Sequence, residues 1–229
     1  MLEHELACIE RKLGPGPCSV IHHNAVVTPA DVSWLDGVDA MMIGGSGDFS
    51  VHHPRSQAWV TPLRGVVEEA LKRSLPGFGI CFGHQLLGQH LGSQVITDPE
   101  SAELGTVDVQ LTKTGASSPL FKHFSSSLRA HCGHSDRVDA LPDGVDLLAS
   151  NARCETQSFQ VRGTQFYSVQ FHPDMTGAEA RYRYLAYRDG FAERLDGEAR
   201  KAAERFIEDD DESCSLLERF VELVRADLA

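Results

Sequence analysis

The chain has 229 residues, of which 41% are hydrophobic, and a formal net charge of −12 at pH 7. This length and apolar content suit one large core, so we expect a single domain spanning residues 1–229. The acidic balance argues against nucleic acid as a partner, because phosphate binding needs a basic surface. No apolar run approaches the ~20 residues of a membrane span.

The six cysteines have no metal-type Cys-x-x-Cys spacing; they occupy positions 8, 18, 81, 132, 154 and 214. We therefore expect neither a metal site nor a cofactor. No signal peptide is evident at the start of the chain, and cysteines in such a context are normally reduced. The prediction is a cytoplasmic protein with free thiols.

The first third of the chain alternates helical and extended patterns. Residues 1–13 have apolar side chains at helical spacing, and residues 18–22 are typical of a short strand. A buried strand is expected at 38–43, followed by the glycine-rich loop 44–47. Thr61 and Pro62 suit the N-cap and first position of a helix.

Further strand patterns follow, and the last third is mainly helical. Strands are expected at 78–80, 94–97, 106–112, 145–150, 156–161 and 164–171. Helices are expected from 177 to about 207 and again near the C-terminus, so the core covers about 15–180 and a helical region 177–229. This alternation predicts an α/β fold, with flanking helices on a doubly wound, mostly parallel sheet.

A cysteine lies between two glycines where an apolar strand gives way to a helix. In the sequence Gly79-Ile-Cys81-Phe-Gly83, hydrogen at the positions two before and two after the cysteine leaves room for a tight reversal. This is the thiol version of a nucleophile elbow. The N-terminus of the following helix, 82–91, would favour the reactive thiolate of Cys81.

A candidate base lies 91 residues downstream. Phe166 to Phe171 has the composition of a strand, and Pro173 ends it, so His172 is expected at a strand terminus. A histidine there can accept the thiol proton, and Asp174 can orient the imidazole. The residues thus predict a Cys81–His172–Asp174 triad.

These motifs resemble those of the class I (triad) glutamine amidotransferases, in particular stand-alone domains similar to the amidotransferase half of GMP synthetase. The resemblance rests on residues 79–85 and 169–174. It is supported by 41–47, which resembles the family's oxyanion strand, and by the short motifs at 103–105 and 134–136. It implies a flavodoxin-like class I amidotransferase fold.

The resemblance also implies further site residues and a reaction. The backbone N–H groups of Gly45 and Phe82 would stabilise the oxyanion, and Gln85 would contact bound glutamine. Cys81 would attack the glutamine amide and form a thioester, with ammonia passed to an acceptor. Because the chain lacks a Ser-Gly-Gly-x-Asp-Ser phosphate loop, any synthetase would be a separate subunit.

Two positions depart from the family pattern. The third triad member is normally glutamate, so the shorter Asp174 is expected to orient His172 less well. The family also begins with a β-strand, whereas residues 1–13 are helical in pattern, so the first strand of the sheet is expected to be absent.

Three functions are compatible with these residues. The leading one is a glutaminase-type amidotransferase. The second is a γ-glutamyl peptidase or hydrolase, which would use the same triad on the γ-glutamyl amide of a larger amine. The third is a non-catalytic regulatory protein on the same scaffold.

Overall fold

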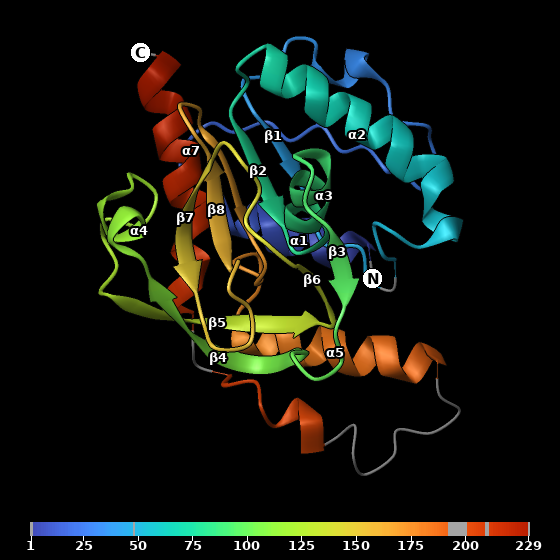
Figure 1. The fold of residues 1–229 in the computed structure, drawn as a ribbon, viewed down its shortest axis with the longest axis vertical. Helices are drawn as coiled ribbons and strands as arrows, with labels where there is room; N and C mark the ends of the chain where they lie inside the picture. Colours follow the sequence, from blue (N-terminus) through green and yellow to red (C-terminus); the bar gives the residue numbers. More distant parts are fainter. Residues whose placement is uncertain (1, 48, 192–200, 209–210, 229) are drawn as a thin grey trace.

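A computed structural model describes the chain except for residues 1, 48, 192–200, 209–210 and 229. Its centre is a seven-stranded sheet in the order β1-β2-β9-β8-β7-β4-β5 (Figure 1). These strands are β1 Met41–Ile43, β2 Gly77–Ile80, β4 Glu103–Leu111, β5 Ser127–His134, β7 Val145–Ser150, β8 Ser158–Val161 and β9 Phe166–Val169. A separate antiparallel pair consists of β3 Val95–Thr97 and β6 Asp136–Val138.

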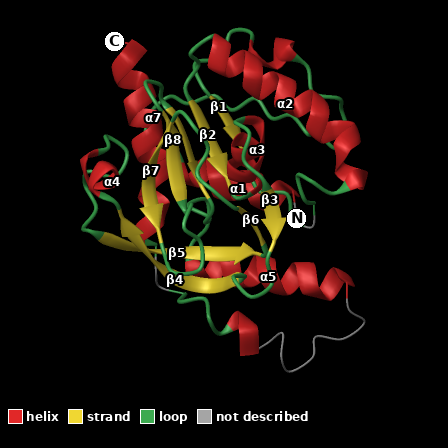
Figure 2. Cartoon of the chain, viewed as in Figure 1, coloured by secondary structure: helices red, strands yellow, loops and turns green. Residues whose placement is uncertain are grey.

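Helices flank the sheet, as Figure 2 shows. The α-helices are α1 Leu2–Lys12, α2 Gln57–Lys72, α3 Phe82–His90, α4 Lys113–Ser117, α5 Gly177–Phe191 and α7 Ser215–Leu228. Short 3-10 helices are η1 Val32–Leu35, η2 Pro54–Ser56 and η3 Glu212–Cys214. The predicted α/β fold class is confirmed. None of the helices in the described ranges combines the length and apolar character needed to cross a bilayer.

The sheet is mixed, and its parallel part lies next to the predicted site. Strand β2 pairs in parallel with β1 on one side and with β9 on the other. From β9 outward through β8, β7, β4 and β5 the pairing is antiparallel. The expected parallel pairing therefore holds for β1, β2 and β9, whose carboxyl ends meet at one edge.

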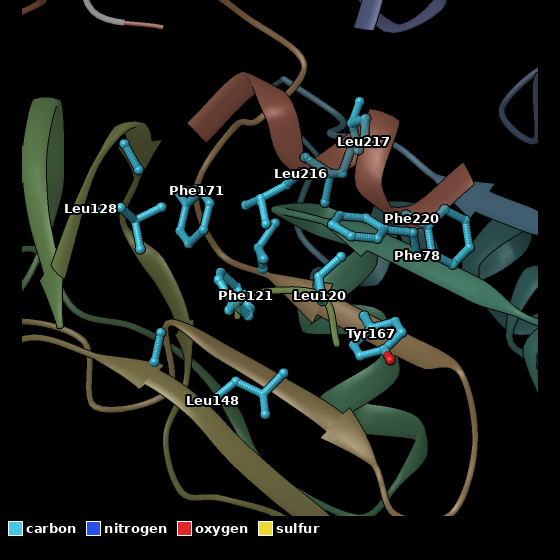
Figure 3. Close-up of a cluster of buried hydrophobic side chains, with 14 of the residues drawn as sticks. Phe78, Leu120, Phe121, Leu128, Leu148, Tyr167, Phe171, Leu216, Leu217 and Phe220 are labelled. Carbon is cyan, nitrogen blue, oxygen red and sulfur yellow. The ribbon is translucent and has the colours of Figure 1, made fainter. Parts of the chain in front are cut away.

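Adjacent residues of the central strands face opposite layers. Phe78 of β2 and Tyr167 of β9 pack with Phe220 of α7 in one core cluster (Figure 3). Phe166, one residue before Tyr167, belongs to a second cluster with side chains of α2 and α3. This alternation, with period two, buries both faces of the sheet.

The strand predicted at residues 18–22 is not formed. The segment has no regular structure, and Val20 and Ile21 are 43% and 63% exposed. A strand is stabilised by a neighbour in the sheet, and in the described part of the chain β1 pairs only with β2. Consistent with the helical pattern of residues 1–13, no described strand precedes β1. Residues 18–22 therefore pair with no strand in the described part of the chain, although β1 has an unpaired edge.

The predicted start of the helix at Thr61 and Pro62 is also wrong. Helix α2 begins at Gln57, so Pro62 lies inside it. Proline there removes one backbone hydrogen bond. Burial of Val60 and Leu63 on either side offsets that loss, since each carries apolar surface into the core. Packing, which the cap signal does not report, decides the boundary.

Helix α3 approaches β1 and β2 too closely for any side chain at two glycines. A Cβ on Gly83 would lie 2.3 Å from the carbonyl oxygen of Ile43. A Cβ on Gly79 would lie 2.8 Å from the backbone of Gly83. Both contacts are with backbone, which cannot rotate away. These glycines therefore let the helix begin directly against the strands.

We predict that Gly83→Ala lowers the free energy of unfolding by roughly 1–3 kcal/mol, because the new methyl group forces α3 away from β1. Gly65→Ala is the matched control, since a Cβ there meets nothing within 4 Å in the middle of α2. It should raise stability by about 0.5–1 kcal/mol through helix propensity. Urea unfolding of both variants measures the difference. Equal effects would contradict the close-packing argument.

Candidate active site

Cys81 occupies a strained backbone conformation between β2 and α3. Its φ of 49° and ψ of −97° lie in a region that residues with a side chain rarely adopt. The backbone N–H of Cys81 donates to the carbonyl of Val169 at 2.8 Å, which extends the β2–β9 ladder by one step. The thiol is partly exposed. The predicted elbow is thus present in geometry as well as in sequence.

The strand register explains why Cys81 and His172 meet. Ile80 of β2 pairs with Val169 of β9, so the residues that follow these strands emerge at the same edge. The backbone N–H of His172 donates to the carbonyl of His131 at 2.8 Å, which anchors the turn on β5. A separation of 91 residues in sequence therefore becomes direct contact.

Asp174 contacts the imidazole despite its short side chain. His172 Nδ1 and Asp174 Oδ1 are 3.0 Å apart, and both side chains are buried. Nδ1–H donates to the carboxylate, which leaves Nε2 for exchange of the thiol proton. The aspartate side chain is therefore long enough to contact the imidazole, and how well it orients His172 relative to glutamate stays a prediction.

Charges govern the protonation of the pair. Burial alone would lower the pKa of His172, but the nearby charges of Asp174 and Cys81, with hydrogen bonds to both, raise this pKa to about 10. Burial alone would raise the pKa of Asp174, but His172 and then Arg183 hold that pKa below its ordinary range. The arrangement thus favours a cationic imidazole next to an anionic carboxylate.

Gly45 and Phe82 lie on either side of the nucleophile. A Cβ on Gly45 would be 2.9 Å from Cε1 of His172 and 3.9 Å from Cβ of Cys81. Phe82 is the first residue of α3, where backbone N–H groups lack an acceptor within the helix. Both backbones therefore lie next to Cys81.

Gln85 lies one helical turn beyond Cys81 and is buried. Its Nε2 donates to the carbonyl of Asp136 at 2.8 Å and to Oε1 of Gln170 at 3.2 Å. Gln170 in turn contacts Cys81 Sγ through its own Nε2 at 3.6 Å. Gln85 thus reaches the thiol through Gln170. The sequence reasoning missed Gln170, although its position directly after β9 and two residues before His172 could have indicated it.

The two short motifs at 103–105 and 134–136 meet beneath this network. His134 Nε2 lies 3.0 Å from Glu103 Oε2, and His134 Nδ1 lies 3.0 Å from the carbonyl of Asp136. The pair holds the same Asp136 carbonyl that Gln85 contacts.

Glu103, Cys132 and His134 place ligand atoms within 4.8 Å of one another, which is close enough to hold a metal ion. Glu103 already accepts hydrogen bonds from Asn151 at 2.7 Å and Gln157 at 2.6 Å. Both nitrogens of His134 are also engaged. A structural hydrogen-bond network accounts for this cluster.

Comparison with protein families supports the resemblance seen in the motifs. The model of the family "Glutamine amidotransferase class-I" matches residues 13–188. The chain is 32% identical over 161 residues to a protein of Sulfurisphaera tokodaii that is named as one subunit of a glutamine-hydrolyzing GMP synthase. That match covers 68% of this chain and 79% of the relative.

The chain also resembles one part of longer proteins. It is 35% identical over 135 residues to the GMP synthase of Malacoplasma penetrans, covering 59% of this chain but 24% of the relative. A glutamine amidotransferase structure from Thermotoga maritima superimposes with a TM-score of 0.67 at 23% identity. The superposition covers 83% of this chain and 79% of the Thermotoga maritima chain. This structural likeness supports the fold.

We predict that iodoacetamide alkylates Cys81 faster than any other thiol below pH 7, because the His172 cation favours its thiolate. Burial raises the pKa of Cys8, raises that of Cys132 well above its ordinary value, and raises those of Cys154 and Cys214 to about 11 and 12. Mass spectrometry after limited labelling locates the adducts.

Exposed Cys18 is the internal control, since it is accessible but lies outside the triad. His172→Ala should slow labelling of Cys81 and leave that of Cys18 unchanged. Faster labelling of Cys18 than of Cys81 in the unmodified protein would contradict the elbow as an activating site.

Proposed function

Because the chain belongs to the class I glutamine amidotransferase family, we propose that it hydrolyses the side-chain amide of glutamine through a thioester on Cys81. The proposal is carried by one arrangement: a strained cysteine and a histidine–aspartate pair at the ends of two neighbouring parallel strands. The three side chains have the relative order that nucleophile, base and orienting acid require.

The first half-reaction follows from the charges of the pair. The Cys81 thiolate attacks Cδ of glutamine, and the carbonyl oxygen becomes negative. His172, positively charged next to Asp174, gives its proton to the departing nitrogen, so ammonia leaves and the thioester forms. The second half-reaction uses the same histidine as a base, which removes a proton from water as it attacks the thioester. Glutamate and the free thiol result.

Two backbone donors next to Cys81 are suited to stabilise the intermediate. The N–H groups of Gly45 and Phe82 would donate to the oxyanion, and loss of one such donor typically lowers the rate by about 10²–10³-fold. We assign Gln85 to the glutamine pocket with Gln170, which its amide contacts. Together they fix a polar wall on one side of the thiol.

We further propose that ammonia passes to a separate synthetase protein. The support is that one relative is named as a single subunit of a GMP synthase, and that the chain corresponds to about a quarter of the longer GMP synthases. In such an arrangement, this chain generates ammonia, and a partner activates the acceptor.

We predict that the protein releases equal amounts of ammonia and glutamate from glutamine. Cys81→Ala should abolish the reaction, because no covalent intermediate can form. Asp174→Ala should lower kcat less, by ~10²–10⁴-fold, because His172 keeps some population of the productive tautomer. Enzymatic ammonia and glutamate assays measure both products. Equal kcat for Asp174→Ala and the unmodified protein would place the third triad member elsewhere.

The same assay separates amidotransferase chemistry from γ-glutamyl peptidase chemistry. Glutamine and a panel of γ-glutamyl amides with larger amines are compared at equal concentration. The proposal expects the highest kcat/KM for glutamine. Higher kcat/KM for a γ-glutamyl amide would reassign the protein to the peptidase class.

We also predict an effect on a GMP-forming synthetase that lacks its own amidotransferase domain. Addition of this chain should enable that synthetase to use glutamine as its nitrogen source. Ammonium salts should support amination by that synthetase alone, whereas glutamine should support it only when this chain is added. Addition of Cys81→Ala protein is the control and should restore nothing. If glutamine with this chain supports GMP formation no faster than the ammonia released into solution can account for, this synthetase is not the direct acceptor.

A further inference from the structure

We propose that Arg183 is a positioning residue that fixes the Asp174 carboxylate so that it orients His172. This inference rests on the proposed function of the triad, and it adds a fourth side chain from a different element. Arg183 lies in α5, nine residues after Asp174, and neither the sequence motifs nor the comparisons indicate it.

The geometry places the two oxygens of Asp174 on different partners. Oδ1 lies 3.0 Å from His172 Nδ1, and Oδ2 accepts from Arg183 Nη1 at 3.1 Å. A carboxylate held at one oxygen can still rotate about its Cβ–Cγ bond. A second bond at the other oxygen fixes the plane, and thereby the direction in which Oδ1 faces the imidazole.

Arg183 is buried, so its contact with Asp174 belongs to the interior of the site and is not a surface ion pair. The side chains of Arg183 and Asp174 are only 9% and 4% exposed, and the described residues offer Arg183 Nε and Nη2 no hydrogen-bond partner. Burying a guanidinium is costly unless an anion compensates it. Asp174 is the anion that Arg183 contacts directly.

The contact between Arg183 and Asp174 compensates for the burial of the aspartate side chain. The Asp174 carboxylate contacts His172 from a buried turn, where it is withdrawn from water. Without Arg183, Oδ2 would lose the one side-chain donor that the described residues offer it, and the ionised form would be less favoured. Arg183 supplies both the donor and the charge.

Other ionisable groups also face this pair, and they bear on any pH dependence. Cys81 and His172 lie on the substrate side, and Cys214 of η3 faces Asp174. Helix α1 faces Arg183 through His4, Glu5 and Cys8. Arg183→Gln leaves these residues in place, but it removes a cation that lowers the pKa of His4 and of Cys8. The alkylation readout is therefore taken at Cys81 alone.

The test compares Arg183→Gln, Arg183→Lys and a matched control, Arg181→Gln. Arg181 lies on the same helix and pairs with Glu208 at the surface, so its replacement makes the same chemical change without touching Asp174. Two readouts are taken for each full-length protein: kcat and KM for glutamine, and the pH dependence of iodoacetamide alkylation at Cys81.

Arg183→Gln is expected to lower kcat by roughly tenfold or more, as loss of a hydrogen bond to a charged group implies, with KM changed less than twofold. The Arg183 cation favours ionised Asp174, so its removal raises the pKa of Asp174. Support for the thiolate is then lost at a higher pH, and the acid limb of the alkylation profile moves upward. Arg183→Lys should recover part of both effects, and Arg181→Gln should match the unmodified protein.

A double substitution separates positioning from a merely structural role. If Arg183 acts through Asp174, Arg183→Gln should have no further effect in an Asp174→Asn background. Additive losses, or an Arg183→Gln protein with the kcat and alkylation profile of Arg181→Gln, would overturn the proposal. Should Arg183→Gln fail to fold, Arg183→Lys decides, since it retains the cation and is expected to lose several-fold in kcat.

The two proposals can fail separately. Absence of glutaminase activity in the unmodified protein would reject the proposed function, whereas alkylation of Cys81 requires no glutamine and would still report on Arg183. Conversely, glutaminase activity combined with an alkylation profile insensitive to Arg183 would reject only the positioning role.

Discussion

The parallel pairing of β2 with β9 is the constraint on which the candidate site depends. Since Ile80 and Val169 are register partners, Cys81 and Gln170 are adjacent as soon as the strands end, and His172 follows within two residues. Strand β1, paired on the other side of β2, brings Gly44 and Gly45 to the same edge. One three-strand register therefore gathers the thiol, the imidazole and the glycine loop, and the close approach at Gly83 holds α3 against them.

Charged side chains then fix the orientation of the residues that the strand register brings together. His172, Asp174 and Arg183 alternate in charge over two contacts of 3.0 and 3.1 Å in a region withdrawn from water. Beneath Cys81, a second polar chain leads from Gln170 through Gln85 to the Asp136 carbonyl. Cys81 is thus bordered by two hydrogen-bonded networks. One consists of charged side chains, and the other consists of two amide side chains and a backbone carbonyl. Both are anchored on elements far apart in sequence.

Much of the fold and of the candidate site could be predicted from local sequence, because short runs of contiguous residues determine the elbow and the strand ends. Gly79, Cys81 and Gly83 define a turn by sterics alone, and Pro173 marks where β9 stops. What could not be predicted depended on packing between distant elements. The strand expected at 18–22 is wrong, since that segment pairs with no described strand and leaves the edge of β1 unpaired. Arg183 carries no motif; it became visible only when α5 was placed against Asp174.

The open side of β1 has a consequence for the glycine loop that follows it. In the described part of the chain, Met41 to Ile43 pair only with β2, and Ile43 leads directly into Gly44. Any extended peptide added along this edge would bond to the backbone immediately before the loop. The loop borders His172, with Gly45 close to the imidazole. Mechanical tension or restraint applied at the sheet margin would therefore be transmitted, within a few peptide units, to the groups that line the thiol.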